Sequence, residues 1–316
     1  MKFGNIHVEN PFVQAPMAGV TDAACRTISR KFHSGIIFTE MISAEGLCRG
    51  NWKTLNYTRI NEEHKPLGLQ LVGRDPERMS LAAVKAEELG ADFIDINAGC
   101  PQVRITSTGC GGAMLKNPEI LANTVSAVKK AASIPVTVKM RLGYSKDDSI
   151  HISGMVRDAG ADLITIHGRT VAQKFSGHSN WQAIKDIVEF LDIPVLANGD
   201  ARNEQSAVEL LDNTGAAGVM IGRATRGRPD LPGTAFSLLE NGHFTRMSHN
   251  TLRDTMLEHA RLEQELFDEL GGMKRMRKHV TWYLKAAGLG YDSHQVYSLE
   301  TMKELENFLE IIRGKN

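Results

Sequence analysis

Cys100 is the residue of this sequence best suited to give a proton to a substrate. It stands between Gly99 and Pro101, directly after a predicted strand at residues 93–97. A free thiol has a pKa of about 8.5 and is mostly protonated at neutral pH, so it can act as an acid as well as a nucleophile. A cysteine that only fills apolar space is the alternative, and it suits Cys25 and Cys48 better than this loop.

Five of the predicted strands end in polar side chains. These ends are Gln70, Asn97, Lys139, His167 and the run Asn198-Gly199-Asp200. Arg141 and Arg169 each follow one of them by two residues and therefore point the same way, because side chains of a strand alternate with a period of two. In a barrel of parallel strands the carboxyl ends form the active site, so this pattern favours a functional site over a solvated rim.

Each of these polar residues also has an interpretation without function. Gln70 could satisfy buried backbone groups, Lys139 could extend its amine to solvent, and a single histidine such as His167 is often a packed, hydrogen-bonded residue. The apolar strand around Lys139 favours the functional interpretation. For Gln70 and His167 taken singly, both interpretations remain open.

The loops after the last two predicted strands contain Asn198-Gly199-Asp200 and Gly222-Arg223. Barrels often bind phosphate there with glycine amides and a positive side chain, although two ordinary turns would carry the same residues. The sequence has no G-x-G-x-x-G after a strand and no G-x-x-x-x-G-K-[ST]. Rossmann and P-loop nucleotide sites are therefore disfavoured.

The elements that must position these side chains are short apolar runs alternating with helical patterns. The predicted strands are residues 12–17, 36–41, 67–72, 93–97, 136–140, 163–167, 195–198 and 218–221. Asp75-Pro76-Glu77 begins one of the intervening helices and Gly90 ends it. Eight such units close into a TIM (β/α)8 barrel, an α/β fold, and an open doubly wound sheet is the alternative.

No strand pattern follows residue 240, and the rest of the chain is predicted to be helical. Apolar faces indicate helices at 251–270, 273–287 and 299–312, with Gly271-Gly272 ending the first. Proline, glycine, asparagine and serine cluster in 229–248, which predicts a linker. We therefore expect a catalytic barrel at residues 1–240 and a small C-terminal all-helical domain at 241–316.

The composition of the 316 residues excludes several classes of protein. Thirty-seven Lys and Arg balance 37 Asp and Glu, so any contact with nucleic acid must come from a local patch. Neither a membrane-spanning stretch nor an apolar signal core is present, and four cysteines without a C-x-x-C pair suit reduced thiols. We expect a cytoplasmic protein. With no H-x-x-x-H or H-E-x-x-H among the eleven histidines, no zinc site is predicted.

Several longer motifs together resemble those of the tRNA-dihydrouridine synthase family. In chain order they are Ala15-Pro16-Met17-Ala18-Gly19-Val20-Thr21-Asp22, Thr39-Glu40-Met41, Gln70-Leu71-Val72-Gly73, Asn97-Ala98-Gly99-Cys100-Pro101, Val138-Lys139-Met140-Arg141, His167-Gly168-Arg169-Thr170 and Asn198-Gly199-Asp200. The resemblance covers nearly the whole chain, including its helical tail. It departs from the family at Pro229-Asp230-Leu231-Pro232, where members commonly show an aromatic pair.

The resemblance implies a barrel that holds FMN, takes electrons from NADPH and reduces the C5=C6 bond of uridines in tRNA. The implied FMN contacts are Pro16, Met17, Ala18, Gln70, Lys139, His167, Asn198, Gly199, Asp200, Gly222 and Arg223. Cys100 matches the proton donor, and Asn97 and Arg141 would place the uracil, with Arg169 as a further residue on the substrate side. Hydride addition at C6 leaves an enolate-like C5, which an acid on the opposite face must protonate. Lys139 would stabilise the negative charge of the reduced cofactor.

Contact with tRNA requires positive charge, and the helical tail contains a cluster of it. Lys274, Arg275, Arg277 and Lys278 lie within five positions of a predicted helix. A solvated face is the usual meaning of such a run, but the resemblance favours contacts with phosphates. Arg226 and Arg228 are candidates to extend the patch. The target base must leave its stack to enter the pocket, and nothing in the sequence predicts a protein partner.

Two other functions fit parts of the sequence. An FMN barrel acting on a free pyrimidine, of the dihydroorotate or dihydropyrimidine dehydrogenase type, explains the barrel but not the basic tail. The other is a non-catalytic tRNA-binding protein that uses an inherited barrel.

Overall fold

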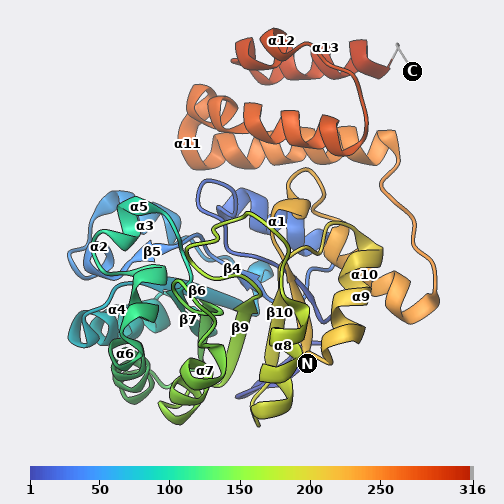
Figure 1. Cartoon of the computed structure of the whole chain (residues 1–316). Coiled ribbons are helices and arrows are strands. Elements are labelled where there is room, and N and C mark those ends of the chain that lie inside the picture. Colours follow the sequence, from blue (N-terminus) through green and yellow to red (C-terminus); the bar gives the residue numbers. More distant parts are fainter. Residues whose placement is uncertain (314–316) are drawn as a thin grey trace.

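The computed structural model describes residues 1–313, apart from the side chains of residues 53, 312 and 313. A barrel of strands and helices is followed by three further helices, which lie together beyond one end of the barrel (Figure 1). The antiparallel pair β1 (Lys2–Phe3) and β2 (Ile6–His7) precedes the barrel.

The barrel is built from parallel strands and is nearly closed. Its neighbouring strands are, in spatial order, β3 (Phe12–Gln14), β11 (Gly218–Ile221), β10 (Val195–Asn198), β9 (Leu163–His167), β8 (Val136–Arg141), β7 (Phe93–Ala98), β6 (Leu67–Val72) and β4 (Ile37–Phe38). Between β4 and β3 the contact is completed by the Gly35 N–H, which donates to the Phe12 carbonyl at 3.0 Å. The predicted TIM-type fold is confirmed.

Two predicted strands are shorter than expected. The first ends at Gln14, so Pro16 and Met17 lie in the loop after it; proline has no N–H with which to continue a ladder. The second is interrupted after Phe38 and resumes as β5 (Ile42–Ser43) beside β6. At the interruption Thr39 Oγ1 accepts the Gln70 N–H at 3.0 Å, so a side chain replaces a ladder partner.

Helices cover the outside of the barrel and bury an apolar layer against the strands (Figure 1). They are α1 (Ala23–Lys31), α2 (Ala44–Cys48), α4 (Pro76–Glu88), α6 (Pro118–Ala131), α7 (Ser149–Asp158), α8 (Trp181–Phe190) and α9 (Glu204–Thr214). Two short helices, α3 (Trp52–Tyr57) and α5 (Val103–Thr106), lie at one end of the barrel instead. The predicted start of α4 is confirmed, because the Asp75 side chain accepts the Arg78 N–H at 2.9 Å. None of the helices within residues 1–313 combines the length and apolarity that crossing a bilayer requires.

The segment predicted as a linker is largely helical. Residues 231–241 form α10 (Leu231–Asn241), which packs against α9 and β3 and buries Leu231 and Ala235 in the barrel core. Pro232 lies in the first turn, where proline starts a helix rather than breaking one. Only the short stretch 242–248 connects the barrel to the C-terminal helices.

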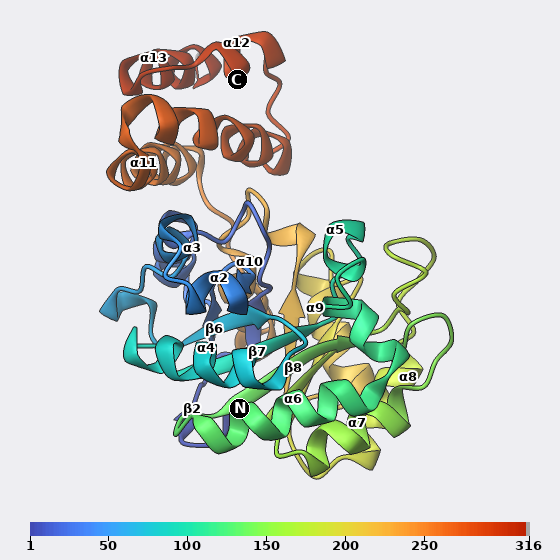
Figure 2. The ribbon, with the colours of Figure 1, turned by 90° about the vertical axis from the view of Figure 1, so that its left-hand side faces the viewer.

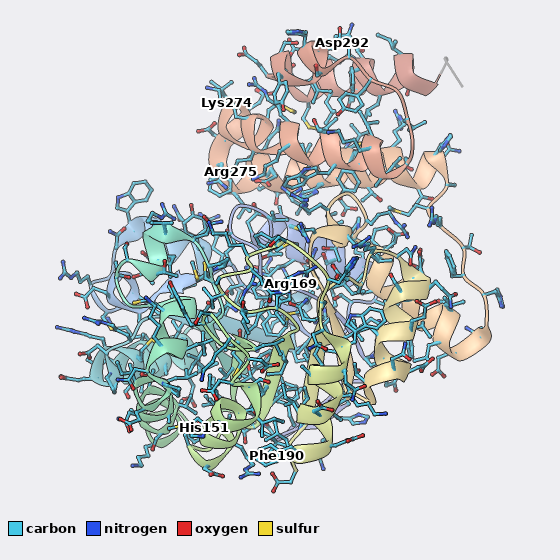
Figure 3. The ribbon with its side chains drawn as sticks, in the orientation of Figure 1. His151, Arg169, Phe190, Lys274, Arg275 and Asp292 are labelled. Carbon is cyan, nitrogen blue, oxygen red and sulfur yellow. The ribbon has the colours of Figure 1, made fainter. Side chains whose placement is uncertain are left out.

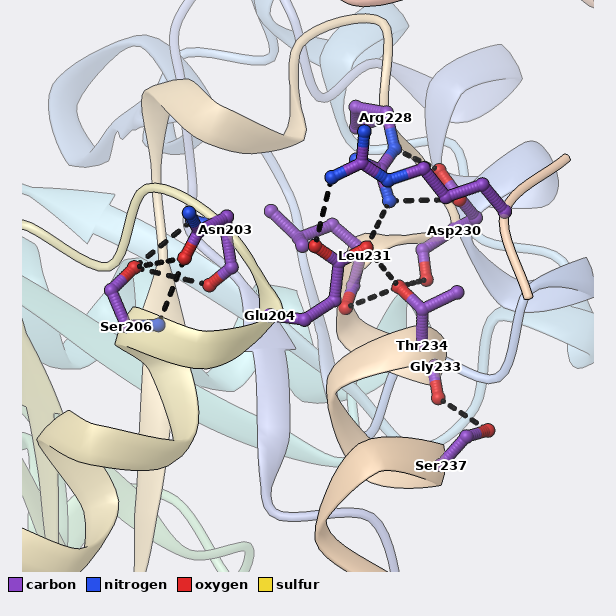
Figure 4. Close-up of polar contacts among 10 residues, drawn as sticks. Asn203, Glu204, Ser206, Arg228, Asp230, Leu231, Gly233, Thr234 and Ser237 are labelled. Carbon is purple, nitrogen blue, oxygen red and sulfur yellow. Dashed lines mark hydrogen bonds and ion pairs between the residues drawn. The ribbon is translucent and has the colours of Figure 1, made fainter. Parts of the chain in front are cut away.

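Residues 229–232, where the sequence departs from the family pattern, are held by a buried ion-pair network (Figure 4). The Arg228 guanidinium donates to Asp230 at 2.8 Å and to Glu204 of α9 at 2.5 Å. Thr234 Oγ1 also donates to Glu204, at 3.1 Å. Asp230 and Glu204 are almost fully buried, so Arg228 neutralises charge inside the barrel wall.

The C-terminal helices form a second apolar core. They are α11 (His249–Ala286), α12 (Ser293–Ser298) and α13 (Met302–Arg313). The predicted end at Gly271-Gly272 is wrong: α11 breaks at Phe267 and Asp268, whose backbone is not helical. Gly272 instead allows the two halves of α11 to touch, since a Cβ there would lie 2.6 Å from the Gln264 nitrogen.

Several contacts between described residues join the C-terminal helices to the barrel. Lys31 of α1 pairs with Glu258 of α11, and Lys278 donates to the Gly19 carbonyl in the loop after β3. The Arg226 guanidinium lies 5.1 Å from the centroid of the Trp282 ring. The turned view shows these helices beyond the barrel end that carries α3 and α5 (Figure 2).

Candidate active site

A cavity of about 810 Å³ opens at the carboxyl ends of the strands. Its size lies within the range of roughly 300–1,000 Å³ typical of ligand sites. Every barrel residue assigned above to cofactor, substrate or proton transfer lines it: Pro16, Met17, Ala18, Gln70, Asn97, Cys100, Lys139, Arg141, His167, Arg169, Asn198, Gly199, Asp200, Gly222 and Arg223.

A chain of side-chain hydrogen bonds sets the orientation of two amides in this cavity. Asp95, fully buried in the middle of β7, accepts from Thr137 at 2.6 Å and from Gln70 Nε2 at 2.7 Å. Gln70 Oε1 is thereby left to accept from Asn97 Nδ2, at 2.9 Å. Asn97 Oδ1 must then face the loop that carries Cys100. The buried carboxylate of Asp95 thus decides which atoms the side-chain amides of Gln70 and Asn97 present.

The Cys100 loop is held by hydrogen bonds with the Asn97 side chain and with the backbone of Gly112. The Gly99 and Cys100 N–H groups donate to Asn97 Oδ1 at 3.2 and 3.0 Å. The Gly112 N–H donates to the Cys100 carbonyl at 3.0 Å, and a Cβ on Gly112 would lie 2.6 Å from Val171. The thiol is partly exposed at the cavity, as an acid that meets a substrate must be.

Lys139 extends from β8 into the same cavity. Its amine donates to Asn198 Oδ1 at 3.1 Å, and the Asn198 Nδ2 group donates to the Met220 carbonyl at 2.6 Å. Burial, reinforced by the positive charge of Arg141, lowers the pKa of Lys139 to about 8. The amine therefore still carries a proton at neutral pH but is poised to interact strongly with a bound negative charge.

His167 and Arg169 form a rigid pair at the end of β9. The Arg169 guanidinium, only 1% exposed, donates to both oxygens of Asp200 at 2.8 Å. It also lies 3.2 Å from His167 Nε2, and because guanidinium can only donate, that nitrogen accepts and Nδ1 carries the ring proton. Burial and four nearby positive charges, Lys139 foremost, lower the pKa of His167 to about 2, so the ring is a neutral donor.

Near β10 and β11 the cavity wall contains glycines, so a ligand can come close to the backbone there. Gly199 has a φ of +123°, and a Cβ there would lie 2.4 Å from Ser179 Oγ and 3.0 Å from the His167 ring. Gly222 and Arg223 follow β11 on the adjacent wall. Asp200 is the one acidic residue among the cavity lining of the described chain, and Arg169 neutralises it.

Comparison with known proteins assigns the chain to a family. The family model described as dihydrouridine synthase (Dus) matches residues 13–312. This chain is a dihydrouridine synthase family member. It is 36% identical over 291 residues to tRNA-dihydrouridine synthase B of Vibrio vulnificus, covering 90% of this chain and 89% of that protein. A probable tRNA-dihydrouridine synthase of Rickettsia bellii is 33% identical over 287 residues, covering 90% and 88%.

Solved structures agree with the fold of this family member. An old yellow enzyme homologue of Zymomonas mobilis matches with a TM-score of 0.55 at 15% identity, over 80% of this chain and 94% of that one. Morphinone reductase in complex with tetrahydroNAD matches equally well, over 80% and 92%. At such identities the likeness supports the barrel fold alone.

The four basic residues of the tail lie in different settings rather than on one free face. Lys274 is exposed, and Arg275 stacks 3.7 Å from the centroid of the Phe267 ring. Arg277 Nε donates to the Leu299 carbonyl at 2.7 Å, inside the helical domain, and Lys278 is bound to Gly19 of the barrel. Figure 3 shows Lys274 and Arg275 at the left end of the helical layer above the barrel, and Arg169 near the middle of the barrel.

The sequence analysis missed two residues that shape this family member's site. It assigned no role to Asp95, although a charged residue inside the apolar run Phe93-Ile94-Asp95-Ile96 is itself a signal. Phe175 lies in the loop after β9, is 47% exposed, and stacks with Arg223 at 4.8 Å and with Arg141 at 5.5 Å. No sequence pattern marked it.

Proposed function

We propose that this chain is a cytoplasmic, FMN-dependent tRNA-dihydrouridine synthase that reduces the C5=C6 bond of specific uridines with NADPH as the reductant. The observation that carries the proposal is the position of Cys100. Cys100, whose backbone N–H donates to Asn97 Oδ1, lines a basic cavity at the carboxyl ends of the barrel strands. The family relatives are named for this activity.

The donor groups of the cavity fit FMN. Its phosphate is an anion, and the wall formed by Gly199, Gly222 and Arg223 offers a close approach, a positive charge and the neutral donor His167 beside it. Gln70, Lys139 and Asn198 supply the remaining hydrogen-bonding groups for a polar ring, and Pro16, Met17 and Ala18 line the apolar side. When bound, FMN supplies the two-electron reduction.

The chain's own residues place the base and deliver the proton. Cys100 donates its thiol proton to C5 of the uracil, and Asn97 and Arg141 orient the ring. Arg141 holds the site together at the same time, because Nε donates to the Gly99 carbonyl at 2.9 Å and Nη1 to the Thr170 carbonyl at 2.9 Å. Arg169, bound on all sides, acts as a positioning residue for His167 and Asp200.

We divide the chain at the end of α10 into a catalytic barrel, 1–240, and a tRNA-binding helical domain, 241–316. Of Lys274, Arg275, Arg277 and Lys278, we assign the phosphate contacts to Lys274, which is exposed, and to Arg275, which is stacked on Phe267 of its own helix. Arg277 and Lys278 serve mainly to hold the helical domain together and to dock it on the barrel. With no net charge on the chain, binding depends on this local patch.

The full-length protein tests this function directly. Incubated with FMN, NADPH and tRNA from a strain lacking dihydrouridine, it should form dihydrouridine at defined positions, measured by mass spectrometry of the nucleosides. Activity on free uracil or dihydroorotate but not on tRNA would favour a free-pyrimidine dehydrogenase. A preparation that binds tRNA but cannot be loaded with FMN would favour a non-catalytic tRNA-binding barrel.

Replacing Lys274 and Arg275 together with alanine should weaken tRNA binding and flatten its salt dependence. Each lost phosphate contact removes roughly 0.7–0.9 from the slope of log K against log salt, so the slope should fall by up to about two. The measurement is a binding titration at several salt concentrations. Lys130 and Lys185, exposed on α6 and α8, provide the matched control pair. An unchanged slope in the Lys274/Arg275 variant would remove the patch from the tRNA interface.

A further inference from the structure

Three titratable side chains meet inside the helical domain, away from the cavity. His259 and Glu263 lie on the first half of α11 and His279 on the second half. All three are at most 3% exposed, and their ligand-type atoms lie within 4.8 Å of one another. One Glu263 oxygen is 3.9 Å from Nε2 of each histidine.

These polar atoms have no hydrogen-bond partner as long as the carboxyl groups of Glu263 and Asp22 are both ionised. The unpartnered buried atoms are Nε2 of His259, Nε2 of His279 and both carboxylate oxygens of Glu263. Asp22 of the barrel, whose charge acts on Glu263, adds a fifth: its Oδ1 accepts the Cys25 N–H at 3.0 Å, but its Oδ2 is buried and unpartnered. Buried polar groups are normally satisfied, so several that converge unsatisfied point to a missing ligand.

The fold itself brings these residues together. The break at Phe267 and Asp268 turns α11 back on itself, and Gly272 lets its two halves touch. His259 Nδ1 lies 3.1 Å from the Tyr283 hydroxyl. If Nδ1 carries the ring proton and donates it to Tyr283, Nε2 is left free as a ligand, which is the arrangement that orients metal-binding histidines.

We propose that His259, Glu263, His279 and Asp22 bind a structural Zn²⁺ ion between the helical domain and the barrel. Two imidazoles and two carboxylates are zinc ligands, and four protein ligands without an open position are typical of structural sites. Bonds of about 2.0–2.2 Å place tetrahedral ligands roughly 3.3–3.6 Å apart, so the 3.9 Å separations between Glu263 and the histidines must contract by a few tenths of an ångström. Ligand atoms that lie up to 4.8 Å apart must move further, and Asp22, which is outside this group of three, must move in to complete the set. Calcium and magnesium prefer oxygen ligands and fit this set poorly.

Such an ion would connect the helical domain to the wall of the cavity. Asp22 follows Thr21, whose Oγ1 accepts the N–H of the cavity residue Met17 at 3.0 Å. The ion would therefore fix how the tRNA-binding helices sit over the barrel mouth. Short sequence motifs could not indicate this site, because its ligands come from two halves of a broken helix and from a distant loop.

The competing state of the cluster holds a proton in place of a cation. With no cation bound, burial, the charge of Asp22 and a hydrogen bond that the Glu263 carboxyl donates to Asp22 raise the pKa of Glu263 to about 9, so that the group would be protonated at neutral pH. Proton and metal are therefore alternatives for the same carboxylate, and a direct metal measurement distinguishes them.

The test uses the untagged full-length protein. Elemental analysis of the purified chain should find one equivalent of zinc. After chelation, added Co²⁺ should give the intense visible bands of a tetrahedral site, and added Zn²⁺ should raise the melting temperature. Glu263→Gln and His279→Gln should abolish the cobalt bands, whereas Glu265→Gln and His294→Gln, which alter exposed residues of α11 and α12, should keep them.

Two results would overturn the site. One is a wild-type chain that carries no zinc and develops no tetrahedral cobalt spectrum. The other is binding that persists undiminished in folded Glu263→Gln and His279→Gln. Should either variant fail to fold, judged by circular dichroism, the metal content and cobalt spectrum of the wild-type chain alone decide.

Discussion

Replacing Cys100 with alanine is expected to reduce dihydrouridine formation about 10²–10⁴-fold, the range for loss of a positioned general acid. FMN content and tRNA affinity should stay at their wild-type values, because the backbone N–H of residue 100 can still donate to Asn97 and its carbonyl can still accept from Gly112. The measurement is single-turnover formation of dihydrouridine at saturating tRNA.

Cys110→Ala is the matched control for this variant. Cys110 lies in the neighbouring loop, and its thiol meets only the Thr108 carbonyl, at 3.8 Å, among the described residues. The Cys110→Ala enzyme should keep wild-type activity. A Cys100→Ala enzyme that turns over normally would show that another group protonates C5, and the proposed division of labour in the cavity would be wrong.

The parts of this fold that sequence could predict are those controlled by local signals. The strands of the barrel were found because fully buried parallel strands are nearly continuous apolar runs. The helix at Pro76 was found because its cap and first turn are adjacent in the chain. The break in α11 was misplaced because glycine usually signals an end, whereas Gly272 is required by close packing of two distant turns.

The site was predictable to the extent that strand ends share one rim. That rule alone placed Gln70, Lys139 and His167 around one cavity. It could not reveal what those residues do to one another. The buried carboxylate of Asp95 acquires its role only through partners on two neighbouring strands. Arg277 and Lys278 are bound by the carbonyl groups of Leu299 and Gly19, and no spacing within a helix predicts those contacts.

Replacing Lys139 with methionine is expected to lower the rate of uridine reduction about 10²–10³-fold, comparable to the removal of one preorganised electrostatic contact. Methionine keeps most of the length of the side chain but removes its charge. FMN should also bind more weakly, because the cavity loses a positive group that a negatively charged ligand would meet. Titration of the full-length protein with FMN, followed by flavin fluorescence, measures the second effect without turnover.

The pH dependence separates a charge effect from a packing effect. The pKa of Lys139 is lowered to about 8, so its positive charge is complete well below that pH and is lost as the pH rises through it. Wild-type FMN affinity should therefore fall above pH 8. His167, with a pKa of about 2, is already neutral, and Arg141, with a pKa of about 10, still carries its charge there. The phosphate, with a second pKa near 6, is a dianion throughout this range.

The Lys139→Met protein should bind FMN weakly and with no such fall above pH 8. The control is Lys130→Met, which removes an exposed lysine of α6 and should leave both the affinity and its pH profile unchanged. If Lys139→Met retained the wild-type decline, the titrating group would have to be another one, and the lysine would contribute packing rather than charge. Because burial beside Arg141 disfavours the charged amine, a bound anion should raise the pKa of Lys139, so FMN affinity should fall from the pKa of the free protein up to the higher pKa of the FMN-loaded enzyme and then level off.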